Sequence, residues 1–200
     1  MPRLRLGVLI SGRGSNLHAL IDACADPAYP AEIVSVISDR AEAAGLAIAA
    51  AAGITGVAIR HDDRQAFAAE ADVLLREQRA DLVCLAGFMR VLDTAFVEAW
   101  RDRMVNIHPS LLPAFPGLDA QHQALEHGVK LTGCTVHFVD EDLDAGPIVL
   151  QSAVPVLNED TVETLSARIL DEEHRIYPEA IRIVLGGHYR IEGRRVIVSA

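Results

Sequence analysis

The chain alternates short runs of aliphatic residues with longer, alanine-rich segments that have a helical period. Strands of parallel sheets are continuously apolar, whereas helices repeat every three to four residues, so the short runs are predicted as buried strands. In the first half we expect strands at 6–10, 33–37, 56–59, 82–86 and 104–107 and helices at 16–25, 41–51 and 96–100, with one more helix facing inward through Phe67, Val73, Leu74 and Leu75. This order favours parallel pairing, right-handed crossovers and helices on both faces of the sheet.

The second half follows a different pattern. Residues 134–139 and 148–154 alternate like an antiparallel pair around an acidic loop, after a short helix at 121–126. Residues 161–185 form a long amphipathic pattern, with an interruption expected near Pro178 because its ring disfavours the helical conformation of the preceding residue. A hairpin of residues 189–191 and 196–198 closes the pattern. The prediction is a single domain over residues 1–200 with a Rossmann-like α/β fold, whose open twisted sheet is mostly parallel with an antiparallel C-terminal part.

The amino-acid composition limits the classes of partner and the cellular compartment. Half of the 200 residues are hydrophobic, which is enough for one substantial core. The net charge of -10 argues against nucleic acid as a partner, because binding its backbone requires clustered Lys and Arg. Cys24, Cys84 and Cys134 are odd in number and far apart, which indicates free thiols in a reducing compartment. No segment approaches the roughly 20 apolar residues of a membrane span, so we expect a cytoplasmic protein with no membrane partner.

A glycine-rich loop, Gly12-Arg13-Gly14-Ser15-Asn16, follows the first strand and opens the first helix. Backbone N–H groups and the positive end of a helix favour an anion there, and we expect a single phosphate. The dinucleotide fingerprint does not fit, because Leu17 stands where a third small residue belongs and Asp39 lies too far along the chain. The alternative is a tight turn with Ser15 or Asn16 as a helix N-cap.

Asn106 and His108 lie two residues apart at the end of a predicted strand, so their side chains point to the same face. An amide and an imidazole side by side can donate hydrogen bonds to an oxygen that becomes negative during acyl transfer. A structural role for a lone histidine is the alternative. His137 sits in an alternating strand, and it and the remaining histidines are expected to be structural or surface residues.

The acidic loop runs from Asp140 to Asp144. It resembles a calcium loop only superficially, because the sixth position is Ala145 instead of Gly and the twelfth is Gln151 instead of Glu. A solvated turn is one interpretation of these carboxylates. The other is that Asp144, which begins a constrained turn, approaches His108 and orients its ring.

Five segments of the sequence closely resemble the phosphoribosylglycinamide formyltransferase family of purine synthesis, in the same order and over nearly the whole chain. They are residues 11–16 (SGRGSN), 85–90 (LAGFMR), 106–113 (NIHPSLLP), 135–139 (TVHFV) and 144–148 (DAGPI). The segment at 106–113 alone indicates only the wider formyltransferase group. Ala114 and the pair Gln121-His122 depart from the family pattern and put only peripheral anion contacts in doubt.

The resemblance implies a role for each matching position. Asn106, His108 and Asp144 correspond to the catalytic residues, and the phosphoribosylglycinamide-binding residues correspond to Gly14, Ser15, Asn16 and Glu173. The folate site corresponds to Arg64, Met89, Arg90, Val91, Leu92, Asn106, Asp140, Glu141, Asp142, Leu143 and Asp144. By this resemblance Asp144 keeps His108 protonated while the glycinamide amine attacks the formyl carbon of 10-formyltetrahydrofolate, which is the co-substrate, and no metal takes part.

Two rivals belong to the same group, formyltetrahydrofolate hydrolase and methionyl-tRNA formyltransferase. The first is expected to carry an extra regulatory domain before the first strand and the second a basic domain after the catalytic one. A rival of another class is a folate or nucleotide sensor without turnover, which the presence of all three candidate catalytic residues argues against. The expected partners are small-molecule substrates; a homodimer is compatible with the sequence, which does not specify the oligomeric state.

Overall fold

A computed structural model describes residues 3–199 of the chain and divides it into two compact units. The first unit extends to Val105 and the second begins at Asn106. The chain passes from one to the other within strand β5 (Met104–His108). Each unit is described by itself below.

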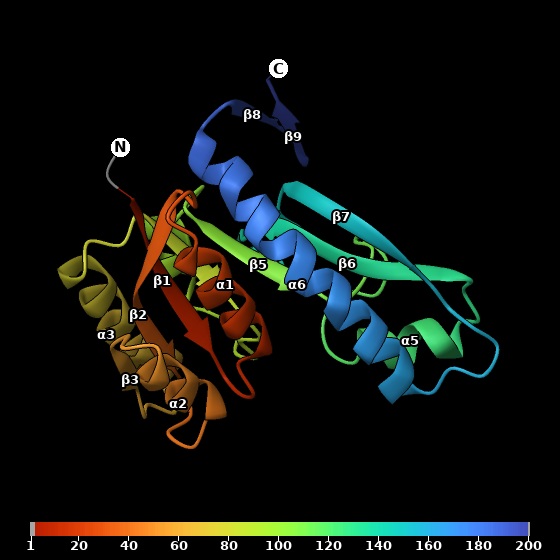
Figure 1. Ribbon diagram of the computed structural model, residues 1–200, viewed down its shortest axis with the longest axis horizontal. Coiled ribbons are helices and arrows are strands. Elements are labelled where there is room, and N and C mark those ends of the chain that lie inside the picture. The colour runs from red at the N-terminus through yellow and green to blue at the C-terminus, as the bar shows by residue number, and fades with distance from the viewer. Residues whose placement is uncertain (1–2, 200) are drawn as a thin grey trace. The chain divides into compact units, whose positions relative to one another are not determined.

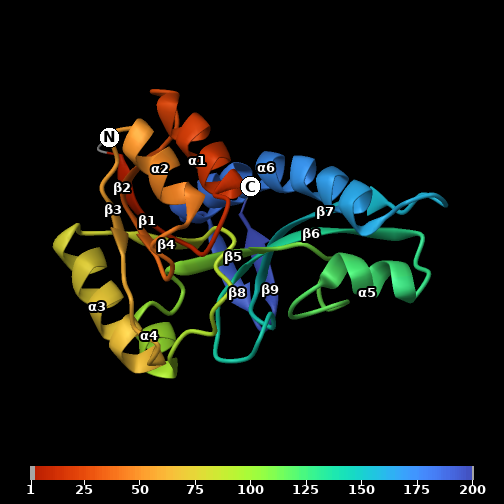
Figure 2. The ribbon, with the colours of Figure 1, turned by 90° about the horizontal axis from the view of Figure 1, so that it is seen from below.

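The first unit has the alternating order of strands and helices that the sequence predicts (Figure 1). Its elements are β1 (Leu4–Ile10), α1 (Ser15–Ala25), β2 (Ala31–Ser38), α2 (Ala44–Ala51), β3 (Gly56–Ala58), α3 (Arg64–Glu77), β4 (Leu82–Leu85) and α4 (Thr94–Ala99). The strands lie in the order β3-β2-β1-β4, and every pairing among these four is parallel. Figure 2 shows α1 and α2 on one face of these strands and α3 and α4 on the other. The predicted parallel part of the sheet is confirmed.

Strand β1 lies at the centre of the first unit's core. Four of its aliphatic side chains are completely buried, namely Leu6, Val8, Leu9 and Ile10. The glycine among them is required by packing, because a Cβ atom on Gly7 would lie 2.1 Å from the Cδ2 atom of Leu75. Helix α3 therefore packs its Leu75 directly against the strand backbone.

The second unit contains the end of β5 and the remaining elements. These are α5 (Ala120–Glu126), β6 (Leu131–Phe138), β7 (Ile148–Pro155), α6 (Val162–Gly186), β8 (Tyr189–Glu192) and β9 (Arg195–Val198). Strands β6 and β7 pair antiparallel, as do β8 and β9, whereas β7 and β9 are parallel. The antiparallel C-terminal part and the closing hairpin are thus confirmed.

The expected interruption at Pro178 is wrong, because α6 continues through this residue as one helix of 25 residues. Buried side chains lie on both sides of the proline, including Ile169, Ile176 and Ile181, and the helix packs against β6 and β7. Burial of this apolar face outweighs the backbone hydrogen bond that a proline cannot donate. Thr161 and Thr164 begin the helix with a capping box, which adds to its stability.

The packing of β1 leads to a stability prediction. Gly7→Ala should lower the free energy of unfolding by about 1–3 kcal/mol, because the new methyl group must displace the buried Leu75 side chain. Gly186→Ala is the control, since its Cβ would meet no atom closer than 4.0 Å and should leave stability nearly unchanged. Urea unfolding followed by the fluorescence of the single tryptophan, Trp100, measures both; equal stability of the two variants would contradict the packing argument.

Candidate active site

Asn106 and His108 project from the end of β5 in the second unit, where the sequence places them. Asn106 is half-buried, whereas His108 is only 5% exposed. The His108 ring is held from one side by a backbone carbonyl, since its Nε2 lies 2.9 Å from the oxygen of Phe115. A carbonyl oxygen only accepts hydrogen bonds, so this ring nitrogen carries a proton.

Asp144 reaches the same ring from the loop between β6 and β7. Its Oδ2 atom lies 3.4 Å from Nδ1 of His108 and accepts a hydrogen bond of 2.7 Å from the backbone N–H of Gly117. The Asp144 side chain is only 9% exposed, so this carboxylate is not the solvated group of the alternative interpretation. The predicted approach of Asp144 to His108 is present.

The loop that carries Asp144 has an unusual backbone conformation. Asp144 adopts a left-handed conformation with φ of 52°, and Gly146 lies so close to β6 that a Cβ atom would sit 2.0 Å from the carbonyl oxygen of Phe138. Only glycine permits that approach. The sequence Asp144-Ala145-Gly146 thus turns the carboxylate back toward the end of β5.

His137 is the member of this cluster that sequence reasoning missed. Its Nε2 atom lies 3.3 Å from Nδ2 of Asn106 and 3.7 Å from Oδ1 of Asp144, and its Nδ1 lies 2.8 Å from the carbonyl oxygen of Phe138. A shift in the register of β6 and β7 falls between Val136 and His137, where a bulge can re-aim a side chain. The sequence feature that could have indicated its place in the site is a histidine near the end of a buried strand, seven residues before Asp144.

Burial lowers the pKa of His137, although the carbonyl of Phe138 and the carboxylate of Asp144 act in the opposite direction. The ring is therefore neutral near pH 7, with its proton on Nδ1 facing Phe138. Its Nε2 is then an acceptor and receives one N–H of the Asn106 amide. This contact fixes the orientation of Asn106 and leaves its second N–H for a ligand.

In the first unit, the glycine-rich loop is stiffened by two contacts with Gly45 of α2. Gly14 has φ of 77° and occupies the N-cap position of α1, so neither Ser15 nor Asn16 is the N-cap. A Cβ atom on Gly14 would lie 2.6 Å from Cα of Gly45, and the N–H of Gly45 donates to the carbonyl of Gly12. Gly14 and the first turn of α1 thus present backbone N–H groups in a fixed geometry suited to an anion.

The candidate folate residues of the first unit lie on two segments. Met89 and Val91 are 61% and 59% exposed, while Leu92 is buried. Arg90 donates to the carbonyl oxygens of His61 and Asp62 and stacks over Phe67, and Arg64 begins α3 with an exposed side chain. Adjacent exposed apolar residues of this kind are typical of a ligand-binding surface.

The remaining candidates belong to the second unit. Residues 140–143 of the acidic loop are half-buried to exposed, and the Leu143 side chain is 64% exposed. Glu173 is 6% exposed on α6 and lies near Cys134, whose pKa is raised to about 12 by burial and by the negative charges of Glu173 and Glu172. That thiol is not a nucleophile near pH 7.

Residues 3–199 lack two kinds of feature. No group of three or more His, Cys, Asp and Glu side chains is arranged to hold a metal ion. Nor does this part of the chain contain a helix with the length and apolar character needed to cross a membrane.

Comparison with known proteins identifies the family. A family model described as formyl transferase matches residues 4–181, across both units. The chain belongs to the formyl transferase family. The family match and the solved structures below confirm the predicted α/β fold.

Among curated relatives, phosphoribosylglycinamide formyltransferase of Escherichia coli is 44% identical over 94% of this chain and 90% of its own. The trifunctional purine biosynthetic protein adenosine-3 of Bos taurus is 53% identical over 94% of this chain, which spans only 19% of that longer protein. The resemblance to phosphoribosylglycinamide formyltransferases that the sequence motifs indicate is confirmed.

Solved structures of family members agree with this assignment. Glycinamide ribonucleotide transformylase 1 of Symbiobacterium toebii superposes with a TM-score of 0.96 at 54% identity, covering 99% of this chain and 95% of that one. A formyltetrahydrofolate deformylase of Pseudomonas syringae has a TM-score of 0.92 at 29% identity, covering 99% of this chain and 66% of that one. Proteins named as a transformylase and as a deformylase thus share this fold.

The lowered pKa of His137 leads to a prediction about pH. The unfolded chain binds a proton at His137 below about pH 6.5, whereas the folded protein binds it only at a lower pH because the pKa is lowered. The contribution of His137 to the free energy of unfolding is therefore complete above that pH and is lost as the pH decreases. His137→Gln should flatten the decrease in unfolding free energy between about pH 7.5 and 5.5, by at most about 1.4 kcal/mol per pH unit. Urea unfolding followed by circular dichroism measures this.

The control is His122→Gln, because His122 is exposed on α5 and pairs only with Glu126. This variant should keep the wild-type pH dependence. If His137→Gln also kept it, the assignment of a neutral buried ring would be wrong.

Proposed function

We propose that this protein transfers a formyl group from 10-formyltetrahydrofolate to the amine of N1-(5-phosphoribosyl)glycinamide, a step of purine synthesis in the cytoplasm. The observation that carries the proposal is the buried cluster of Asn106, His108 and Asp144, found in a chain that is 44% identical to a named phosphoribosylglycinamide formyltransferase. The match of one family model to residues in both units supports treating residues 1–200 as one formyltransferase domain.

In this proposal, the amine nitrogen attacks the formyl carbon and the carbonyl oxygen becomes an oxyanion. The free N–H of Asn106 and the Nδ1–H of His108 donate to that oxygen. The long distance of 3.4 Å between Nδ1 and Asp144 allows this N–H to be shared between the carboxylate and the oxyanion. The bond from the formyl carbon to N10 of the folate then breaks, N10 takes a proton, and tetrahydrofolate leaves with the N-formyl product.

Asp144 has two roles in this scheme. Its carboxylate faces His108, whose other ring nitrogen already donates to Phe115, so the doubly protonated imidazolium satisfies both acceptors. It also accepts the proton that the amine loses, directly or through water. No step requires a metal, because the formyl group is already an activated acyl donor.

The binding roles follow from the family resemblance. Gly14, Ser15 and Asn16 hold the substrate phosphate, as the rigid loop at the start of α1 supports, and Glu173 contacts the glycinamide ribonucleotide. The folate contacts come from Arg64, from residues 89–92 and from the 140–144 loop together with Asn106. The exposed apolar side chains of Met89 and Val91 suit an aromatic heterocycle.

The decisive experiment follows release of tetrahydrofolate from 10-formyltetrahydrofolate with and without glycinamide ribonucleotide. Strict dependence on the amine is expected for transfer. Release without the amine would identify a hydrolase, as in the deformylase of this family, and no release under either condition would identify a binding protein. His108→Ala should reduce kcat by about 10²–10⁴-fold with little change in KM, whereas His122→Ala should match the wild type.

The anion loop gives a separate prediction. Gly14→Ala should raise the KM for the phosphorylated substrate at least about tenfold with a smaller effect on the KM for folate, because the new Cβ would clash with Gly45 and displace the loop. Gly53→Ala is a matched control, since Gly53 also has a positive φ of 71° but has open space around its Cβ position. Steady-state kinetics with each substrate varied in turn compare the two variants. Equal effects in both would show that strain, not the phosphate site, is responsible.

A further inference from the structure

Ser11 belongs to the motif at residues 11–16, but the proposed function gives it no role. It follows β1 directly and comes immediately before the glycine-rich loop that holds the substrate phosphate in the proposal. Ser11 is only 2% exposed. A buried hydroxyl needs hydrogen-bond partners, so the partners of Ser11 show which part of the structure it supports.

The N–H and the hydroxyl of Ser11 both bond to the chain that follows β4. The N–H donates to the carbonyl oxygen of Gly87 at 3.2 Å, and the hydroxyl oxygen accepts from the N–H of Met89 at 2.9 Å. The parallel pairing of β1 with β4 ends before this point. Ser11 therefore extends the connection between the two strands into residues 87–92, the folate segment, which is neither helix nor strand.

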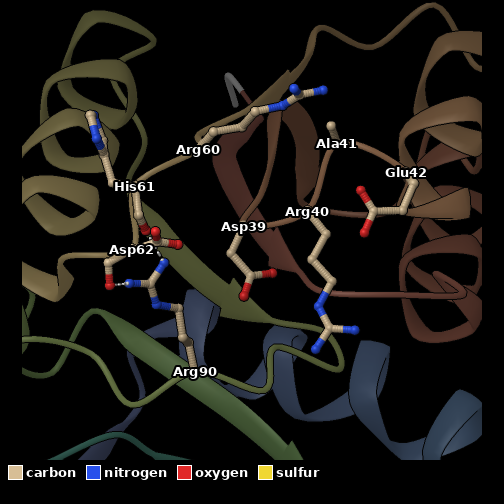
Figure 3. A pocket seen from close by; sticks show the side chains of 8 residues that line it. All are labelled: Asp39, Arg40, Ala41, Glu42, Arg60, His61, Asp62 and Arg90. Carbon is tan, nitrogen blue, oxygen red and sulfur yellow. Dashed lines mark hydrogen bonds between the residues drawn. The ribbon is translucent and has the colours of Figure 1, made fainter.

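Side chains hold the folate segment at two further points. Arg90 donates to two carbonyl oxygens of the loop after β3, beside a polar pocket, as the dashed lines in Figure 3 show. Phe88 stacks on Phe67 of α3 with ring centroids 5.5 Å apart. Met89 lies between these two anchored residues and is itself 61% exposed, so its backbone bond to Ser11 determines where it lies.

We infer that Ser11 is a positioning residue, whose hydroxyl fixes the folate segment relative to the glycine-rich loop. The inference rests on the proposed function, because it assigns a role in binding the folate co-substrate. The glycine-rich loop has support of its own, since the N–H of Gly45 donates to the carbonyl of Gly12 at 3.1 Å and the backbone of Gly45 packs against Gly14. Loss of the hydroxyl should therefore weaken folate binding and spare the phosphate site.

The test measures the binding of tetrahydrofolate and of glycinamide ribonucleotide separately, by isothermal titration calorimetry. Ser11→Ala should raise the Kd for tetrahydrofolate about three- to tenfold, which is the worth of the one hydrogen bond that orders Met89. Its Kd for glycinamide ribonucleotide should equal that of the wild type. A residue that only stabilised the fold would change both constants or neither.

The matched control is Ser35→Ala. Ser35 lies on β2 of the same unit, is also 2% exposed, and its hydroxyl has no hydrogen-bond partner among residues 3–199. This variant loses a buried hydroxyl without losing a contact to the folate segment. It should bind both ligands as the wild type does.

Amide hydrogen exchange followed by NMR provides a measurement that needs no ligand. In Ser11→Ala the N–H of Met89 should exchange about tenfold faster, because its acceptor is gone. The N–H of Ala86, which donates to the carbonyl of Leu9, should keep its rate.

Three results would overturn the role of Ser11 while leaving formyl transfer intact. They are an unchanged Kd for tetrahydrofolate in Ser11→Ala, an equal increase in the Kd of both ligands, and an unchanged exchange rate at Met89. If the wild type did not bind tetrahydrofolate at all, the proposed function itself would be wrong.

Discussion

The carboxylate of Asp144 organises the second unit's candidate site. A buried carboxylate is stable only when hydrogen-bond donors face it, and Oδ2 of this one faces Nδ1 of His108 and accepts from the N–H of Gly117. The left-handed backbone at Asp144 and the close approach of Gly146 to β6 hold it there. Removing the carboxylate would leave the N–H of Gly117 without its acceptor and the buried ring of His108 without its neighbour.

The two histidines of this cluster have opposite requirements. His137 donates to a carbonyl and accepts from Asn106, which fits a neutral ring, whereas both ring nitrogens of His108 face hydrogen-bond acceptors. The ring of His108 lies between a carbonyl and a carboxylate, which is the arrangement that the proposed mechanism requires.

Much of the fold was predictable because it depends on local patterns. Buried parallel strands such as β1 are continuous apolar runs, and the antiparallel pair of β6 and β7 has an alternating one. The continuity of α6 through Pro178 was not predictable from the sequence, because the packing of the helix's apolar face against β6 and β7 overrides the local preference of one residue. Asn106 and His108 were recognisable from a spacing of two on a strand. The role of His137 depends on a bulge that shifts its register, which no local pattern specifies.

Four residues form the cluster around Asp144, namely Asn106, His108, His137 and Asp144 itself. All of them come from one continuous stretch of chain, which runs from the end of β5 to the loop after β6. All of these residues therefore belong to the second unit. A longer multifunctional polypeptide, such as that of the trifunctional relatives, can carry this stretch without supplying another member of the cluster.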